Sequence, residues 1–333
     1  MPEHSIAFKI GGFSIHWYGI VIAAAVFLAI FLASRLSRYR GLKSDAIYDF
    51  SLLAVPFGIV GARVYYVLFS LDYYIANPLD IFKIWNGGLA IYGAVLGGVA
   101  AAAIFAKIRK INLLALMDIG SMVLILAQAI GRWGNFFNQE AYGNLITNPK
   151  WQFFPLAVYI DAQEQWYQAT FFYESMWNLL TFGLLLCIFF GVGFFGKINS
   201  RWEDRRNLGS DKPRMCMPAG TIGCAYFLLY GTGRALIEPL RSDSLMLGPF
   251  RVSFLLSCLM IIAAAFGLYG LRRWGKPAEL CLADAKPTDE LGDSEPAPKD
   301  LEGYESALEP TLAEAEAAVE PEMKADPEPS EKE

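Results

Sequence analysis

Four polar side chains crowd a short glycine-rich segment at the end of a long apolar stretch. Residues 131–143 read Gly-Arg-Trp-Gly-Asn-Phe-Phe-Asn-Gln-Glu-Ala-Tyr-Gly, which places Arg132, Asn135, Asn138 and Glu140 close together. A charged side chain at bilayer depth is costly and usually faces a protein interior or a water-filled cavity. Glycines permit close backbone approach, and the arginine and two amides offer donors to a phosphate or ester oxygen. The segment therefore predicts a binding site for such an oxygen.

Seven apolar segments approach the length that crosses roughly 30 Å of hydrocarbon. They cover about residues 15–36, 46–70, 87–107, 113–133, 171–196, 218–237 and 250–271. Lys and Arg concentrate in the connections after the first, third, fifth and seventh segments. Because cytoplasmic loops carry an excess of these residues, the amino terminus is predicted outside and the carboxyl terminus in the cytoplasm. Residues 1–275 are thus predicted to form an all-α integral membrane domain with seven transmembrane helices.

Two parts of the chain lie outside these spans. Residues 276–333 carry 18 Asp and Glu against 5 Lys, which leaves 23 Lys and Arg against 15 Asp and Glu for residues 1–275. Such an acidic, Pro-rich composition buries too little apolar surface to fold alone, so we expect a disordered cytoplasmic tail. Residues 136–168 form the longest outer connection and are rich in Trp and Tyr, which favour the membrane–water interface. We interpret them as a structured segment on the outer surface, with an ordinary long loop as the alternative.

Metal and disulfide chemistry are not indicated. The five cysteines form no CxxC pair, and the chain has only two histidines, His4 and His16. A disulfide framework, a zinc site and a histidine-rich metal centre are therefore not expected. No organic cofactor and no nucleic-acid partner are indicated either.

Polar side chains from several spans fall near one depth, toward the outer leaflet. They are Tyr18, Arg63, Tyr92, Arg132, Tyr173, Glu174, Tyr230, Arg234, Glu238 and Arg251. Because guanidinium groups match phosphate geometry, Arg132 and Arg234 amid apolar helices predict a site for an anionic phospholipid. Tyr230, Arg234 and Glu238 share one helix face, and an ion pair that only holds the bundle together is an equal alternative for the last two. For Arg63, a buried ion pair or an interfacial position is favoured over ligand contact.

The segment 131–143 resembles the signature of the prolipoprotein diacylglyceryl transferases, G-R-x-G-N-F-x-N-x-E-x-x-G. Its polar positions are filled by Arg132, Asn135, Asn138 and Glu140, and its last glycine is Gly143. Other segments similar to the family are His16–Gly19, Gly61–Arg63, Trp85–Gly93, Thr170–Ser175 and Tyr230–Asp243. The resemblance covers about residues 12–272 and leaves the acidic tail aside.

The resemblance implies a reaction and a location. Members of this family move the diacylglyceryl group of phosphatidylglycerol to the lipobox cysteine of a prolipoprotein signal peptide, as the first step of bacterial lipoprotein maturation. A thioether forms and glycerol phosphate leaves. The thiolate displaces at an sp3 carbon, so charge develops on the departing phosphate, where positioned arginines stabilise it. A multi-pass protein of the bacterial cytoplasmic membrane is implied, with its active site toward the outer leaflet.

Two positions depart from the family pattern and bear on the general base. Some members carry histidine where this chain has Tyr92, and commonly His-Pro where it has Gln168-Ala169. With neither histidine present, the candidates for accepting the thiol proton are Tyr92, Glu140 and Glu238. We expect Arg132 and Arg234 to bind the phosphate. The other predicted substrate-binding residues are Tyr18, Arg63, Asn135, Asn138, Gly143, Tyr230 and Arg241.

Three other functions fit parts of the pattern. A lipid transporter or scramblase also needs arginines around a phosphate, but it would carry polar residues through the inner halves of the spans. Those halves are apolar here, with Asp118 and Gln128 as the few polar exceptions. A seven-helix receptor or structural protein requires no arginine cluster. An acyltransferase or phosphotransferase with the same lipid and another acceptor is separated from the diacylglyceryl transferase only by the signature.

Overall fold

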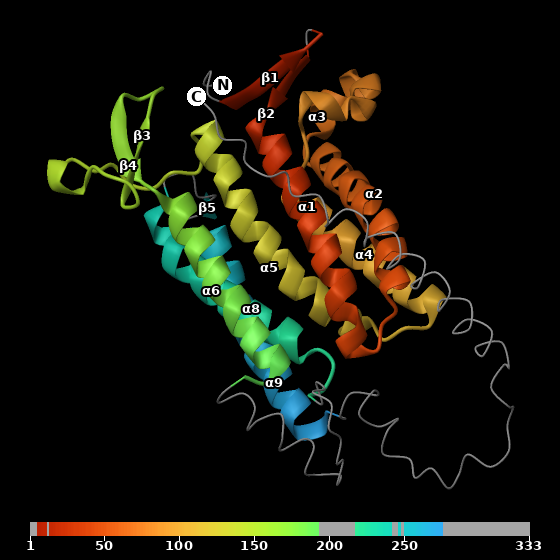
Figure 1. Ribbon diagram of the computed structural model, residues 1–333. Coiled ribbons are helices and arrows are strands. Elements are labelled where there is room, and N and C mark those ends of the chain that lie inside the picture. Colours follow the sequence, from red (N-terminus) through yellow and green to blue (C-terminus); the bar gives the residue numbers. More distant parts are fainter. Residues whose placement is uncertain (1–4, 12, 193–216, 242–245, 248–249, 276–333) are drawn as a thin grey trace, which may run out of the picture. The chain divides into compact units, whose positions relative to one another are not determined.

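The computed structural model describes residues 5–11, 13–192, 217–241, 246–247 and 250–275. These residues all lie within one unit of the chain, residues 1–285. Seven long helices account for most of them (Figure 1): α1 Trp17–Leu36, α2 Ser44–Leu68, α4 Ile91–Arg109, α5 Leu113–Asn138, α6 Thr170–Phe190, α8 Thr221–Ile237 and α9 Val252–Trp274. The predicted acidic tail and most of the predicted basic connection after the fifth span lie outside the described residues.

The predicted helical membrane character is confirmed. Six helices of the described part of the chain, all the long ones except α8, are long and apolar enough to cross a membrane. The sixth predicted span, 218–237, is helical as α8, but at 17 residues it is shorter than the other six. The topology with seven spans therefore stays a prediction.

Helix α5 runs further than the sequence predicts, to Asn138 instead of residue 133. It begins after Asn112, whose side-chain oxygen accepts from the backbone N–H of Leu114 at 2.9 Å and of Ala115 at 3.2 Å, a typical N-cap. It ends where Gln139 adopts the left-handed conformation with φ +50°. Because the signature is helical up to this point, its arginine and two asparagines recur on one face of α5 instead of following it in a loop.

The long helices pack around α5, which lies between α1 on one side and α6 and α8 on the other (Figure 1). Helix α2 pairs with α4, and α9 with α8. The largest fully buried apolar side chains, Ile119, Met122, Ile125, Leu185 and Ile222, come from α5, α6 and α8. These three helices therefore share the core, and their mutual packing fixes whatever polar groups they carry.

Small hairpins and short helices gather at the end where α1 begins and α5 ends, here called the hairpin end (Figure 1). The described residues form three two-stranded antiparallel sheets: β1 Ile6–Ile10 with β2 Phe13–His16, β3 Ala157–Ile160 with β4 Gln165–Gln168, and β5 Met246–Leu247 with β6 Phe250–Arg251. The short helices at this end are α3 Leu71–Ala76, η3 Pro78–Phe82, η4 Ile84–Asn86, η5 Pro149–Trp151 and η6 Glu238–Leu240, whereas η2 Ser37–Arg40 follows α1 at the opposite end. The strands are an addition to the predicted all-α fold. Strands β3 and β4 fill part of the connection between α5 and α6.

Candidate active site

Three arginines converge on one buried carboxylate at the hairpin end. Glu174, the fifth residue of α6, is 3% exposed. Its Oε2 lies 2.6 Å from Nη2 of Arg132 and 3.0 Å from Nη1 of Arg234, and its Oε1 lies 2.9 Å from Nη1 of Arg241. Arg234 also donates to Glu238, one helical turn further, at 2.7 Å. The arginines come from α5, α8 and the residue after η6, so the carboxylate joins segments far apart in the sequence.

Hydrogen bonds between α5 and α6 set the position of Arg132 relative to Glu174. The hydroxyl of Ser175 donates to the carbonyl of Ala129 at 2.9 Å, and the indole of Trp133 donates to the same hydroxyl at 3.2 Å. Both bonds involve residues next to or one turn from the ion pair. The two helices are thereby held in register where the charges meet.

Helices α6 and α8 are held together by a tryptophan over a glycine. The indole of Trp177 donates to the carbonyl of Leu229 at 2.9 Å. A Cβ added at Gly233 would overlap this indole, so only glycine lets the ring lie there. Gly233 precedes Arg234, and this contact therefore sets the distance between Arg234 and Glu174.

The polar residues of the signature continue the network outward from Glu174. With the Asn135 amide oriented to satisfy both neighbours, its oxygen accepts from Nη1 of Arg132 and its nitrogen donates to Glu140, each at 3.2 Å. Asn138 donates to the same carboxylate oxygen at 3.3 Å. Within the described residues, the buried Oδ1 of Asn138 accepts no hydrogen bond. The structure thus brings together Arg132, Asn135, Asn138 and Glu140.

Two predicted tyrosines lie against the helices that carry the arginines. The ring of Tyr18, at the start of α1, packs on Gly134, where an added Cβ would lie 2.6 Å from the Cδ2 atom of the ring. Tyr18 is therefore placed beside the turn of α5 that holds the signature. Tyr230 stacks on Tyr226 with 5.5 Å between ring centroids and lies one turn before Arg234 on α8.

Gly143 closes the signature at a crowded junction. Its N–H donates to the carbonyl of Gln168 at 2.9 Å, and its backbone bridges to Arg241. A Cβ added here would lie 2.8 Å from atoms of Gln168, Leu240 and Thr170, so the close approach of three segments requires glycine. The junction ties the signature to the arginine after η6. The predicted substrate contact of Gly143 stays a prediction.

Arg63 and Tyr92 lie on the α2–α4 pair, and none of the contacts among the described residues joins them to the Glu174 network. Buried Arg63 donates to five backbone carbonyls of the segment after α2, those of Asp80, Ile81, Lys83, Gly87 and Gly88, at 2.5 to 3.5 Å. A guanidinium has five N–H donors, and all of them are engaged here. The partners are carbonyls and not the carboxylate of the predicted ion pair. A substrate contact would require one of these bonds to break, and it stays a prediction.

Tyr92 occupies the first turn of α4 and is partly exposed, with its ring centroid 6.2 Å from that of Tyr65 on α2. The two helices approach closely there because a Cβ added at Gly61 or Gly93 would overlap the carbonyl oxygen of the other. This crossing fixes Tyr92 relative to α2.

The sequence alone assigned no role to two residues that organise the site. One is Glu174, which it placed at the common polar depth without predicting that it binds three arginines. The other is Arg251, which donates to the backbone carbonyls of Glu238 and, at 3.1 Å, of Arg241. A lone carboxylate opening an apolar span at the depth of several arginines was the available signal for Glu174.

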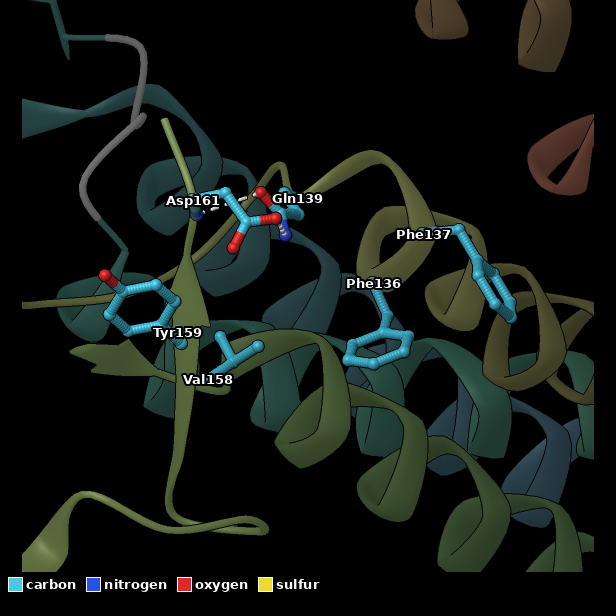
Figure 2. A pocket seen from close by; sticks show the side chains of 6 residues that line it. All are labelled: Phe136, Phe137, Gln139, Val158, Tyr159 and Asp161. Carbon is cyan, nitrogen blue, oxygen red and sulfur yellow. Dashed lines mark hydrogen bonds between the residues drawn. The ribbon is translucent and has the colours of Figure 1, made fainter. Parts of the chain in front are cut away.

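An apolar pocket of about 460 Å³ lies next to the signature segment. Figure 2 shows its lining residues: Phe136, Phe137, Gln139, Val158, Tyr159 and Asp161. Gln139 and Asp161 are joined by two hydrogen bonds of 2.7 and 3.1 Å. The arginines do not line this pocket, and no group of three or more His, Cys, Asp or Glu in the described part of the chain is placed to hold a metal ion. The charged network is therefore the candidate site.

The family model described as prolipoprotein diacylglyceryl transferase matches residues 5–269. The chain belongs to this family. Curated relatives named phosphatidylglycerol–prolipoprotein diacylglyceryl transferase include that of Streptococcus agalactiae serotype Ia, which is 40% identical over 259 residues, covering 77% of this chain and 91% of the relative. The protein of that name from Synechococcus elongatus is 44% identical over 269 residues, with 79% and 84% covered. The one from Listeria innocua is 41% identical over 278 residues, with 82% and 91% covered.

The region matched by the prolipoprotein diacylglyceryl transferase family contains the whole Glu174 network. It also contains the α2–α4 pair with Arg63 and Tyr92. Residues 276–333 lie beyond it, so membership of the family concerns the helical domain and not the acidic tail.

Proposed function

We propose that this chain transfers the diacylglyceryl group of phosphatidylglycerol to the thiol of the lipobox cysteine in a prolipoprotein signal peptide. The observation that carries the proposal is the convergence of Arg132, Arg234 and Arg241 at the family signature. Guanidinium groups bind phosphate through matched N–H donors, and the apolar helices around them suit acyl chains. The names of the relatives supply both substrates of the reaction.

The proposed setting is the bacterial cytoplasmic membrane, crossed seven times. Helix α8 completes the seven spans as the sixth in chain order, with the amino terminus outside and the hairpin end toward the outer leaflet. This orientation follows from the excess of Lys and Arg in alternate connections. Residues 1–275 form the membrane domain, residues 136–168 lie on the outer surface, and residues 276–333 form an acidic cytoplasmic tail. A lipid of the outer leaflet then meets the arginine network at the depth of its headgroup.

In the proposed reaction, Arg132 and Arg234 hold the phosphate of the lipid. The thiolate sulfur attacks the glyceryl carbon bonded to the phosphate oxygen, a carbon–sulfur bond forms, and the carbon–oxygen bond breaks. The electron pair of that bond leaves with glycerol phosphate, whose growing negative charge the guanidinium groups stabilise. The thiol proton passes to a general base and then to solvent. Tyr18, Asn135, Asn138, Gly143, Tyr230 and Arg241 are the other proposed substrate-binding residues.

Glu140 is the base that the geometry favours. It is exposed, and its described partners are the amides of Asn135 and Asn138. Glu238 is 1% exposed and paired with Arg234, which leaves it poorly placed to meet a peptide thiol. Tyr92 lies on the α2–α4 pair and is the remaining candidate.

The test uses the purified full-length chain in lipid nanodiscs with isotope-labelled phosphatidylglycerol and a lipobox peptide. Mass spectrometry should detect the diacylglyceryl thioether with the parent chain. Arg132→Ala should abolish it and Glu140→Gln should slow it strongly, whereas Asp49→Asn, which changes an exposed carboxylate outside the site, should not. A peptide with serine in place of the lipobox cysteine should stay unmodified. If the parent chain binds the lipid but modifies no peptide, a lipid-handling function replaces the proposal.

A further inference from the structure

We propose that Glu174 is a positioning residue that acts as an internal anion: it holds the three arginines together and competes with the lipid phosphate for them. This inference rests on the proposed function, since it concerns the same phosphate site. The carboxylate is almost completely buried and accepts from Arg132, Arg234 and Arg241 through its two oxygens.

Three guanidinium groups within reach of one another repel, because they carry the same charge in a region of low dielectric constant. A carboxylate between them offsets this repulsion and fixes the direction of each guanidinium plane. Glu174 can do so because α6 is tied to α5 by Ser175, the next residue, and to α8 by Trp177, three residues further along. The arginines are thus converged before a lipid phosphate arrives.

The same geometry makes Glu174 unsuitable as the general base. Both of its oxygens already face guanidinium donors at 2.6 to 3.0 Å. A thiol would have to displace an arginine to reach either oxygen. Its effect on the reaction therefore passes through the arginines, which defines a positioning role.

Arg132 is the arginine through which a lipid phosphate meets the network. Its side chain is 24% exposed, against 15% for Arg234 and 12% for Arg241. A phosphate that reaches Arg132 approaches a guanidinium whose Nη2 is already paired with the carboxylate of Glu174. Attraction to the arginine is consequently opposed by repulsion from Glu174.

Two opposite effects follow for substitutions of Glu174. Gln keeps the shape and removes the charge, so phosphatidylglycerol should bind several-fold more tightly while the arginines lose their fixed directions and kcat falls. Asp keeps the charge but is shorter by one methylene, so the lipid affinity should stay within about twofold while kcat falls. Misplacement of a catalytic group by about 1 Å can cost on the order of 100-fold in rate.

The experiment measures lipid affinity and turnover separately in the full-length chain. Binding of a soluble short-chain phosphatidylglycerol is followed by calorimetry, and kcat and KM are measured with the lipobox peptide at saturation. The variants are Glu174→Gln and Glu174→Asp, and the thermal midpoint of each is recorded. Asp49→Asn is the matched control, because it removes the charge of a carboxylate that is paired with an exposed arginine outside the site.

Tighter lipid binding together with a lower kcat in Glu174→Gln supports the proposal. A purely structural role predicts weaker binding and lower activity in parallel with a lower thermal midpoint, and that result overturns it, as does an unchanged kcat. If Glu174→Gln does not fold, Glu174→Asp decides: parental affinity with reduced kcat supports the proposal, and full kcat overturns it. If the parent chain makes no thioether, the proposed function fails, while the affinity measurement still tests whether Glu174 competes with phosphate.

Discussion

Substitution of Asp118 by Asn should destabilise the protein strongly, although Asp118 lies far along α5 from the signature. Its side chain is fully buried and lies 2.5 Å from Nη2 of Arg40, which is 1% exposed. Its carboxylate also accepts from the backbone N–H groups of Gly220 at 2.9 Å and Gly223 at 2.8 Å, at the start of α8. The pair therefore ties the end of α1 and the beginning of α8 to α5.

The size of the effect follows from what Asn leaves behind. The guanidinium of Arg40 would stay buried without a counter-charge, and breaking a buried ion pair in this way costs about 3–5 kcal/mol. At roughly 2–4 °C per kcal/mol for a domain of this size class, the thermal midpoint should fall by about 6–20 °C. The midpoint can be read in detergent with a thiol-reactive dye, because Cys187, Cys224 and Cys258 are free and partly buried in the helices.

The matched control is Asp49→Asn. Asp49 pairs with Arg109, but the two side chains are 42% and 54% exposed, so the loss should stay below about 1 kcal/mol. The double variant Arg40→Met/Asp118→Asn should lose less than the sum of the two single variants, since neither charge is then stranded. A midpoint for Asp118→Asn no lower than that for Asp49→Asn would refute the reasoning.

Three further predictions concern the α2–α4 pair and the segment after α2. Arg63→Lys, with three donors in place of five, should speed hydrogen exchange in the segment whose carbonyls Arg63 holds, while exchange in α9 stays unchanged. Gly93→Ala should cost about 1–3 kcal/mol in thermal unfolding because of overlap with α2, whereas Gly98→Ala, which faces open space, should cost much less. Hydrogen bonds, first from Lys83 and second from Tyr73, lower the pKa of Asp80 in the folded chain. Ionised Asp80 therefore stabilises the fold above the pKa of the unfolded chain, and this stabilisation is lost as pH falls through the lower folded pKa. Protease cleavage of the segment should rise at acidic pH in the parent chain, and Asp80→Asn should remove that pH dependence.

The helices were predictable because their signal is local. Runs of apolar residues specify a span by length alone, and a long helix occupies most of each predicted span in the residues that the structure describes. The end of α5 was misplaced because Arg132 and Asn135 look like the start of a loop in composition. Their polar groups are satisfied by Glu174 and Glu140, so the helix can continue through them. Only the tertiary partners, which hydropathy does not contain, show why the helix extends to Asn138.

The residues of the site also divide into those with a local signal in the sequence and those whose role depends on tertiary partners. Arg132 and Arg234 were found because charge in an apolar span is conspicuous. Glu174 was visible at the right depth, but three arginines from distant segments had to be placed around it before its importance appeared. Arg63 shows the converse: its depth matched that of the cluster, while its five donors serve the backbone of a nearby segment. Depth along a helix constrains one coordinate and leaves direction around the helix open.

The two polar residues that the sequence placed in the inner halves of the spans bear on the choice between a transferase and a lipid transporter. Asp118 is neutralised by Arg40 and bonded to the start of α8. Gln128 is hydrogen-bonded to the hydroxyl of Tyr226, at 3.3 and 3.4 Å. Each is therefore satisfied inside the bundle and offers nothing to a passing headgroup. Arg132, Arg234 and Arg241 converge on Glu174 at the hairpin end, and neither Asp118 nor Gln128 extends that network along α5. This arrangement favours the proposed reaction at one leaflet over a path across the membrane.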